Sequence, residues 1–119
     1  VPIQCEYYAL EGVHRLLDTV SRVKKSLNPG LGVGWVLLTM KDSRTVLSAQ
    51  VSANVRQIFG DQVFSVEIPR NVPLSEAPSF GKTVFEYDRS CKGAEAYRQV
   101  AREMRLKARG SSPAPAGVS

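Results

Sequence analysis

The sequence predicts an α/β fold in which helices flank a mostly parallel sheet, and three observations support this prediction. Apolar residues recur with helical spacing between Leu10 and Leu27. The run GWVLLTM at 34–40 is apolar without alternation, which is typical of a strand covered on both faces. Predicted strands and helices also alternate along the chain, and right-handed crossovers turn that order into a parallel sheet.

The N-terminal half contains four predicted elements. Residues 1–4 form a short strand, and the helix after it ends at Asn28-Pro29-Gly30. The strand at 34–40 is followed by a polar turn at 41–45 and a second helix over 46–59. The apolar stripe of this second helix consists of Leu47, Val51, Val55, Ile58 and Phe59.

The C-terminal half contains the longest stretch without a helical or strand period. Predicted strands at 63–68 and 83–87 flank the fifteen residues from Ile68 to Lys82, IPRNVPLSEAPSFGK. Loops longer than about 12–15 residues are uncommon in compact domains, and they are usually functional or disordered. We therefore interpret this segment as a functional loop.

The last predicted helix covers 94–107, with Ala94, Tyr97, Ala101 and Met104 facing inward. Residues 110–119, GSSPAPAGVS, have the composition of a disordered tail. The length of 119 residues suits one domain, which we place at 1–109. Because the chain opens on VPIQ without a methionine, we expect it to be part of a longer protein.

Composition and cysteine spacing exclude several classes of protein. No apolar run approaches the roughly 20 residues of a membrane span. Cys5 and Cys91 lack the spacing of a zinc site, so we predict no metal ligands and two reduced thiols.

The net charge of +5 comes from one part of the chain. Residues 1–88 hold nine Lys/Arg and nine Asp/Glu, whereas residues 89–109 hold seven Lys/Arg and two Asp/Glu. This asymmetry favours a polyanion partner, either nucleic acid or an anionic membrane. A solvated helix face explains the charge equally well.

The predicted topology brings three segments to one edge of the sheet. Ligands of open parallel sheets bind beyond the carboxyl ends of the strands. Cys5–Glu11, Thr39–Thr45 and Ile68–Lys82 each follow a predicted strand, so we expect them to converge on a binding site.

Familiar catalytic patterns are absent. Gly81-Lys82-Thr83 resembles the end of a phosphate-binding loop, but Glu76 stands where that motif needs a glycine. His14 falls within a helix, off its apolar stripe, and no nucleophile is placed beside it. We predict no catalytic residues in this chain.

Four stretches resemble the C-terminal half of the ParA/Soj family of chromosome-partitioning ATPases: VPIQCEYYALEG, LLTMKDSRT, IPRNVPLSEAPSFGK and KGAEAYRQVARE. The resemblance implies a partial P-loop NTPase fold of the deviant Walker, SIMIBI type, without its N-terminal P-loop half. It also implies a cytoplasmic, nucleoid-associated protein with ATP and Mg²⁺ as cofactors. The family forms ATP-dependent dimers that bind DNA non-specifically, and a ParB-type partner stimulates hydrolysis.

The resemblance assigns roles to individual residues. Glu6 and Tyr7 match a region near the dimer interface, and Arg44 matches an arginine implicated in DNA binding. The residues that match the surroundings of the adenine are Thr39, Met40, Pro69, Arg70 and Asn71. From the residues themselves, Arg98, Arg102 and Arg105 share a helical face, and we add them and Lys82 as DNA contacts.

Two departures from the family pattern carry predictions. The KGGxGKT-like loop and the catalytic carboxylates lie outside the matching region, so this chain alone is predicted not to bind ATP strongly or to hydrolyse it. Pro73 stands where relatives commonly have a basic residue, which predicts weaker DNA binding.

Two alternatives remain open. One is a stand-alone, non-catalytic module that binds DNA or a ParA protein. The other is a MinD-like relative whose basic last helix lies on a membrane; the Ala, Tyr, Ala and Met of that helix offer little bulk for insertion, so a membrane partner is disfavoured.

Overall fold

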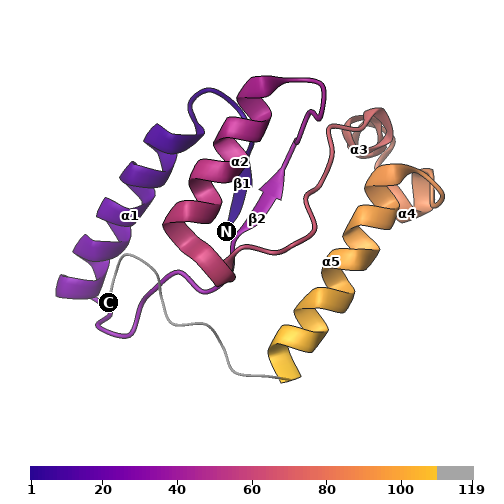
Figure 1. Ribbon diagram of the computed structural model, residues 1–119. Coiled ribbons are helices and arrows are strands. Elements are labelled where there is room, and N and C mark those ends of the chain that lie inside the picture. Colours follow the sequence, from indigo (N-terminus) through magenta and orange to yellow (C-terminus); the bar gives the residue numbers. More distant parts are fainter. Residues whose placement is uncertain (110–119) are drawn as a thin grey trace.

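A computed structural model describes residues 1–109 and shows a small parallel sheet flanked by helices (Figure 1). Strand β1 (Pro2–Gln4) pairs in parallel with β2 (Leu37–Thr39), with Ile3 opposite Leu38. The predicted α/β class and the parallel pairing are therefore confirmed. The predicted tail at 110–119 lies outside the described residues.

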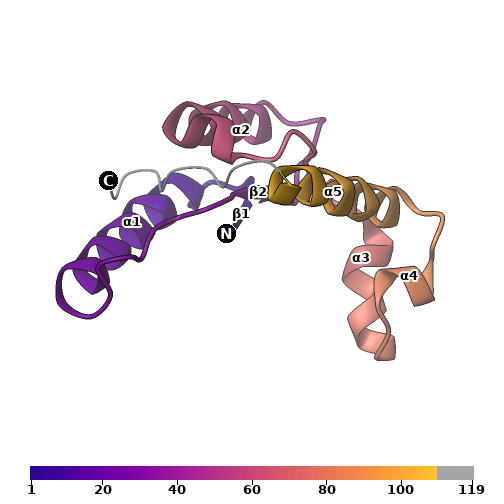
Figure 2. The same ribbon diagram turned by 90° about the horizontal axis from the view of Figure 1, so that it is seen from below.

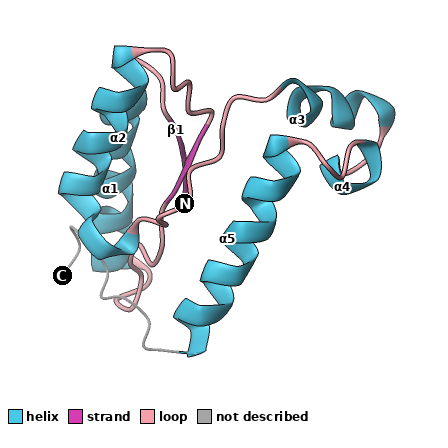
Figure 3. Ribbon diagram, turned by 45° about the vertical axis from the view of Figure 1, so that its right-hand side comes forward, coloured by secondary structure: helices cyan, strands magenta, loops and turns pink. Residues whose placement is uncertain are grey.

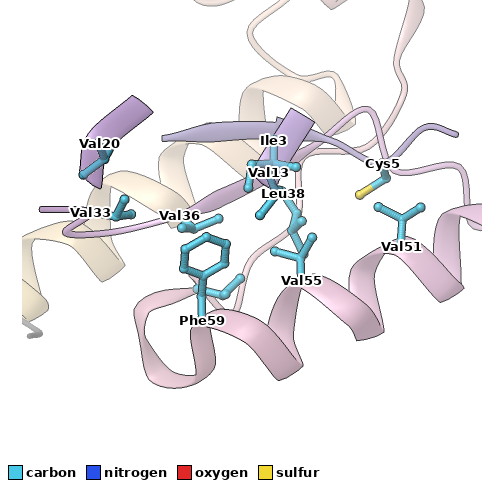
Figure 4. Packing of buried hydrophobic residues seen from close by; sticks show 11 residues of the cluster. Ile3, Cys5, Val13, Val20, Val33, Val36, Leu38, Val51, Val55 and Phe59 are labelled. Atoms are coloured by element: carbon cyan, nitrogen blue, oxygen red, sulfur yellow. The ribbon is translucent and has the colours of Figure 1, made fainter. Parts of the chain in front are cut away.

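Alternate side chains before and along β2 enter two different cores. Val36 and Leu38 pack with Val13 of α1 (Ala9–Ser26) and Val55 of α2 (Val46–Phe59), as Figure 4 shows for the larger core. Their neighbours Trp35 and Leu37 pack instead with Ala96 and Val100 of α5 (Lys92–Arg109). Because successive side chains of a strand point to opposite faces, α1 and α2 cover one face of the sheet and α5 covers the other, as Figure 2 shows from below.

The helices of the N-terminal half follow the prediction closely. α1 begins and ends one residue earlier than the predicted span, and α2 has the predicted bounds. The stripe on α2 is only partly buried, since Leu47 and Ile58 remain 43% and 40% exposed. Ser48 and Ser52 are buried in their place.

The prediction of a third strand at 63–68 is wrong, because no regular strand forms there. This segment runs parallel to β2 but pairs only through isolated bridges, Val36 with Val63 and Lys41 with Pro69. Ser65, between these bridges, donates its backbone N–H to the Glu103 carboxylate on α5, at 2.8 Å. The Phe64 and Ile68 amides donate to the carbonyls of Val36 and Leu38, both at 2.9 Å, so four residues of this segment span two residues at β2 and the regular ladder is interrupted.

The predicted long loop and the strand after it are also wrong. The loop contains helix α3 (Val72–Glu76) and the 3-10 helix η2 (Ala77–Phe80). Residues 84–87 form a short helix, α4 (Val84–Tyr87), instead of a strand. Thr83 and Glu86 make a reciprocal capping box there, which satisfies the first N–H groups of a helix. A second 3-10 helix, η1 (Gly60–Gln62), follows α2.

Helix α5 is longer than predicted, and its buried face matches the predicted one only in part. Ala94 is buried and Tyr97 is half-buried as predicted, but Ala101 and Met104 are exposed. The side chains that reach the core are Ala96 and Val100. Figure 3 shows α3 and α4 beside the N-terminal end of α5, on the side away from α1 and α2. Both cysteines are free, as predicted.

Candidate functional site

The three segments that the topology predicted to converge do meet at the carboxyl ends of the strands. The Cys5 amide donates to the Thr39 carbonyl at 2.9 Å. The Lys41 amide donates to the Ile68 carbonyl at 3.0 Å, and the Arg70 amide returns a bond to the Lys41 carbonyl at 2.9 Å. These backbone bonds fix the segments after β1, β2 and the interrupted strand against one another.

A cavity of about 320 Å³ opens between the segments after β2 and after the interrupted strand, and α5 closes it on one side. Met40 enters it with a φ of 53°, a left-handed conformation that is uncommon for a residue other than glycine. Such local strain tends to occur at ligand-binding positions. The cavity is lined by Pro2, Thr39, Met40, Ile68, Pro69, Arg70, Asn71, Leu74, Ser75 and Tyr97.

All five residues that the resemblance placed near adenine line this one cavity: Thr39, Met40, Pro69, Arg70 and Asn71. Sequence reasoning missed Leu74 and Ser75 as lining residues, because α3 was predicted as loop. Tyr97 was predicted to face inward, but not to reach a site.

Asn71 carries an unsatisfied acceptor. It occupies the N-cap position of α3, where an asparagine side chain usually accepts from the first turn, yet it makes no such bond. Its Oδ1 atom is buried and, among the described residues, receives no hydrogen bond. Buried acceptors are seldom left unpaired, so a donor from a bound molecule would find a partner here.

An ion pair lies at the rim of the cavity. The Arg70 guanidinium donates to Glu6 Oε1 at 2.8 Å, joining the segment after β1 to the segment after the interrupted strand. Both residues also line a neighbouring cavity of about 390 Å³, together with Tyr7 and Asp42. Tyr7 is 72% exposed and contacts Tyr8 edge to face, so it offers an aromatic surface to solvent.

Behind these cavities, Glu67 is the centre of a half-buried charge cluster that joins the interrupted strand to α2. Its carboxylate accepts from the Ser52 hydroxyl, and it pairs with Lys41 Nζ at 3.5 Å and an Arg56 nitrogen at 3.3 Å. Burial by itself raises the pKa of Glu67, but these three partners outweigh it, so the pKa is lowered. Burial also raises the pKa of the neighbouring Cys5 thiol.

The five basic residues predicted to contact DNA come from three parts of the chain. Arg44, in the turn before α2, is 85% exposed, but its guanidinium is paired with both carboxylate oxygens of Asp42, at 3.1 and 3.3 Å. This hydrogen bonding lowers the pKa of Asp42 and raises that of Arg44. Lys82 is exposed in the turn between η2 and α4.

The three predicted arginines of α5 differ in their availability. Arg98 donates to Glu95 at 3.2 Å and to the Arg89 carbonyl, and it lies 5.4 Å from the centre of the Phe85 ring. Arg98 thus ties α4 to α5. Arg102 is 64% exposed and lies 3.9 Å from Glu95, and Arg105 is exposed.

Pro73 and the Gly81-Lys82-Thr83 run have structural roles. Pro73 falls in the first turn of α3, where a missing N–H costs nothing. Gly81 ends η2 with a φ of 65°, and Thr83 caps α4, so this run forms a turn between two short helices.

Within residues 1–109, no group of acidic, histidine or cysteine side chains is arranged to hold a metal ion. No helix in that part of the chain is long and apolar enough to cross a membrane.

Comparison with known proteins decides the family. No family model matches the chain. It is, however, 55% identical over 104 residues to the chromosome partitioning protein ParA of Caulobacter vibrioides, covering 87% of this chain and 39% of that protein. It is 53% identical to the sporulation initiation inhibitor protein Soj of Bacillus subtilis, covering 87% of this chain and 41% of that protein.

The chain belongs to the ParA/Soj family. It spans about 40% of the length of the curated relatives it matches. The resemblance seen in its four motifs is therefore confirmed.

Solved structures support the same fold. A cobyrinic acid a,c-diamide synthase from Mycobacterium smegmatis with bound ADP and magnesium matches with a TM-score of 0.61 and 30% identity, over 96% of this chain and 39% of that one. A second structure of that enzyme gives a TM-score of 0.59 and 34% identity, over 92% of this chain and 37% of that one. The predicted class, part of a P-loop NTPase fold, is confirmed.

Proposed function

We propose that this chain supplies the adenine pocket and much of the DNA-contacting surface of a ParA/Soj-type ATPase acting in chromosome or plasmid partitioning. The observation that carries the proposal is that Thr39, Met40, Pro69, Arg70 and Asn71 line one cavity. Its volume of about 320 Å³ lies at the lower end of the range for small-molecule sites, which suits a base without its phosphates.

The lining residues fit a purine base. Met40, Pro69 and Leu74 present apolar walls, and Tyr97 adds an aromatic one. The Asn71 amide provides a polar group, and its Oδ1 atom lacks a donor. Apolar walls with a few polar groups that fix orientation are typical of cofactor sites.

This chain alone is predicted not to hydrolyse ATP. In the complete protein, ATP would be the molecule hydrolysed and Mg²⁺ would be its cofactor. The 119 residues contain no KGGxGKT-like loop, and residues 1–109 offer no acidic cluster for Mg²⁺. The described residues fit the base of the nucleotide and not its metal.

The remaining roles extend the same proposal. Glu6 and Tyr7 lie beside the second cavity and would contact the other protomer of an ATP-dependent dimer. Arg44, Lys82, Arg102 and Arg105 are exposed and would bind phosphates of non-specific DNA. A ParB-type partner would stimulate hydrolysis, and the complete protein would act in the cytoplasm on the nucleoid.

Adenosine and purine riboside, which lacks the 6-amino group, test the pocket directly. In NMR titrations of the 119-residue chain, adenosine should shift the signals of Thr39, Met40 and Asn71. We expect it to bind about tenfold more tightly than purine riboside, because a lost hydrogen bond to a buried group costs about 1–3 kcal/mol.

The Asn71→Leu variant should abolish that difference, whereas Asn54→Leu, at an exposed position on α2, should preserve it. Equal binding of the two nucleosides, or shifts confined to other residues, would contradict the assigned pocket.

A further inference from the structure

Asp42 forms an ion pair with Arg44, the arginine that is proposed to bind DNA. Its two carboxylate oxygens accept from Nε and Nη2 of Arg44, and Oδ1 also accepts from the Arg44 backbone amide at 3.0 Å. The guanidinium of Arg44 is accessible to solvent, but its two donors on this side already have an anionic partner. A phosphate oxygen would compete with Asp42 for them.

The acid is fixed more firmly than the arginine. The Asp42 side chain is 22% exposed, compared with 85% for Arg44. The Asp42 amide donates to the Ser48 hydroxyl at 3.0 Å, and its carbonyl accepts from the Thr45 hydroxyl at 3.1 Å. Asp42 is therefore held at the start of α2, and Arg44 is the movable member of the pair.

Asp42 also borders the second cavity, at which Glu6 and Tyr7 are proposed to contact another protomer. Asp42, Arg70 and Glu6 line the same 390 Å³ cavity, and Arg70 is bound to Glu6. Acidic and basic residues thus alternate along this rim, from Glu6 through Arg70 and Asp42 to Arg44. Because Arg70 donates its hydrogen bond to Glu6, Arg44 is the arginine that donates to the Asp42 carboxylate.

We propose that Asp42 is a positioning residue that weakens polyanion binding by withholding the Arg44 guanidinium from phosphate. The inference rests on the proposed role of Arg44 in DNA binding. Exposed ion pairs are weak, so a phosphate displaces Asp42 at a small cost. Removing the charge of Asp42 should raise the affinity for DNA by about two- to fivefold and steepen its salt dependence.

The test is a double-mutant cycle in a complete protein, in which residues 1–109 replace the matching part of Caulobacter vibrioides ParA and ATP is present. Asp42→Asn, Arg44→Ala and the double variant are titrated with a random-sequence DNA duplex from about 50 to 200 mM salt, with fluorescence anisotropy as the readout. The Asp42→Asn variant keeps a side-chain oxygen for the Arg44 amide, so the turn is preserved. Asp42→Ser, whose hydroxyl also accepts, replaces it if thermal melting shows that the first variant is unfolded.

Asp18→Asn is the matched control, because Asp18 forms an exposed pair with Arg22 on α1 at 3.1 Å. We expect Asp42→Asn to tighten binding in the presence of Arg44, to change nothing in the Arg44→Ala background, and to exceed the effect of Asp18→Asn.

The outcomes separate this inference from the proposed function. A gain that persists without Arg44 would be a general charge effect and would overturn the inference. Weaker binding by Arg44→Ala with no gain from Asp42→Asn would overturn the inference and leave the DNA role intact. No binding at all, or no loss with Arg44→Ala, would refute the DNA role of Arg44 and the inference with it.

Discussion

At the scale of single residues, Glu67 shows how a charge is kept at a half-buried position. Its carboxylate has three partners, Ser52, Lys41 and Arg56, which come from α2 and from the turn after β2. Removing one member of such a network leaves the others desolvated and unpaired. The cluster lies behind the two cavities and holds α2 against the segment that supplies Arg70.

Glu67→Gln should lower the free energy of unfolding by about 1–3 kcal/mol near pH 7. Because the folded pKa of Glu67 is lowered, its stabilising contribution is complete above its unfolded value of 4.5 and is lost as the pH falls through the folded pKa. The difference between wild type and variant should therefore shrink in acid.

Urea unfolding followed by circular dichroism at several pH values measures this difference. Glu11→Gln removes the acid of an exposed pair with Arg15 and should change stability by less than about 0.5 kcal/mol. If the free energies of unfolding of the wild-type chain and of Glu67→Gln differ by the same amount down to pH 3, the account of the cluster is contradicted.

At the scale of elements, α3 and α5 approach each other at Gly93. A Cβ atom there would lie 2.5 Å from the Leu74 side chain and 3.0 Å from Asn71 Oδ1. Both neighbours line the predicted adenine cavity, so the glycine lets α5 close one wall of the site. Gly12 in α1 has no atom within 4 Å of its hypothetical Cβ, which makes it a matched control.

Gly93→Ala should destabilise the chain by about 1–3 kcal/mol, because the added methyl group overpacks the contact. Gly12→Ala should instead stabilise it by up to about 1 kcal/mol, the usual gain for alanine in a helix. Denaturant unfolding of both variants measures these effects.

Leu74→Ala should recover part of the loss in the Gly93→Ala background, since it removes the atoms that clash. If Gly93→Ala is as stable as the parent chain, α3 and α5 are not in close contact at this position.

Elements with a strong apolar period could be predicted from the sequence, and those set by distant contacts could not. α1 and α2 were predicted to within one residue, because buried residues recur at helical spacing along both. The third strand failed because the segment carries more residues than β2 between its bonds to Val36 and Leu38, a register that depends on contacts across the fold. Residues 84–87 look strand-like by composition, but the local capping box of Thr83 and Glu86 makes them helical.

The site was predicted in part, and by a different route. The five cavity residues were named from family resemblance, since no periodicity marks them. The Arg70–Glu6 pair spans 64 positions and the Asp42–Arg44 pair depends on the conformation of a turn, so neither could be foreseen. The role of Arg98 as a DNA contact stays a prediction, and its bonds to Glu95 and the Arg89 carbonyl add a structural role that sequence spacing alone does not reveal.

At the scale of the whole molecule, the sheet of the described residues has an open side. β1 pairs only with β2, and its other edge borders a cavity of about 350 Å³ between β1 and α1. Parallel strands are normally buried within larger sheets. Because the chain spans about 40% of the length of its ParA/Soj relatives, the rest of such a protein would supply a strand beside β1.

The most direct test grafts this chain into a relative. In Caulobacter vibrioides ParA, the part that matches these residues, 55% identical over 104 positions, is replaced by residues 1–109. We predict that the chimera hydrolyses ATP and binds DNA in an ATP-dependent way, while the 119-residue chain alone shows no hydrolysis. A folded chimera that neither binds nor hydrolyses ATP, or hydrolysis by the chain alone, would contradict the account.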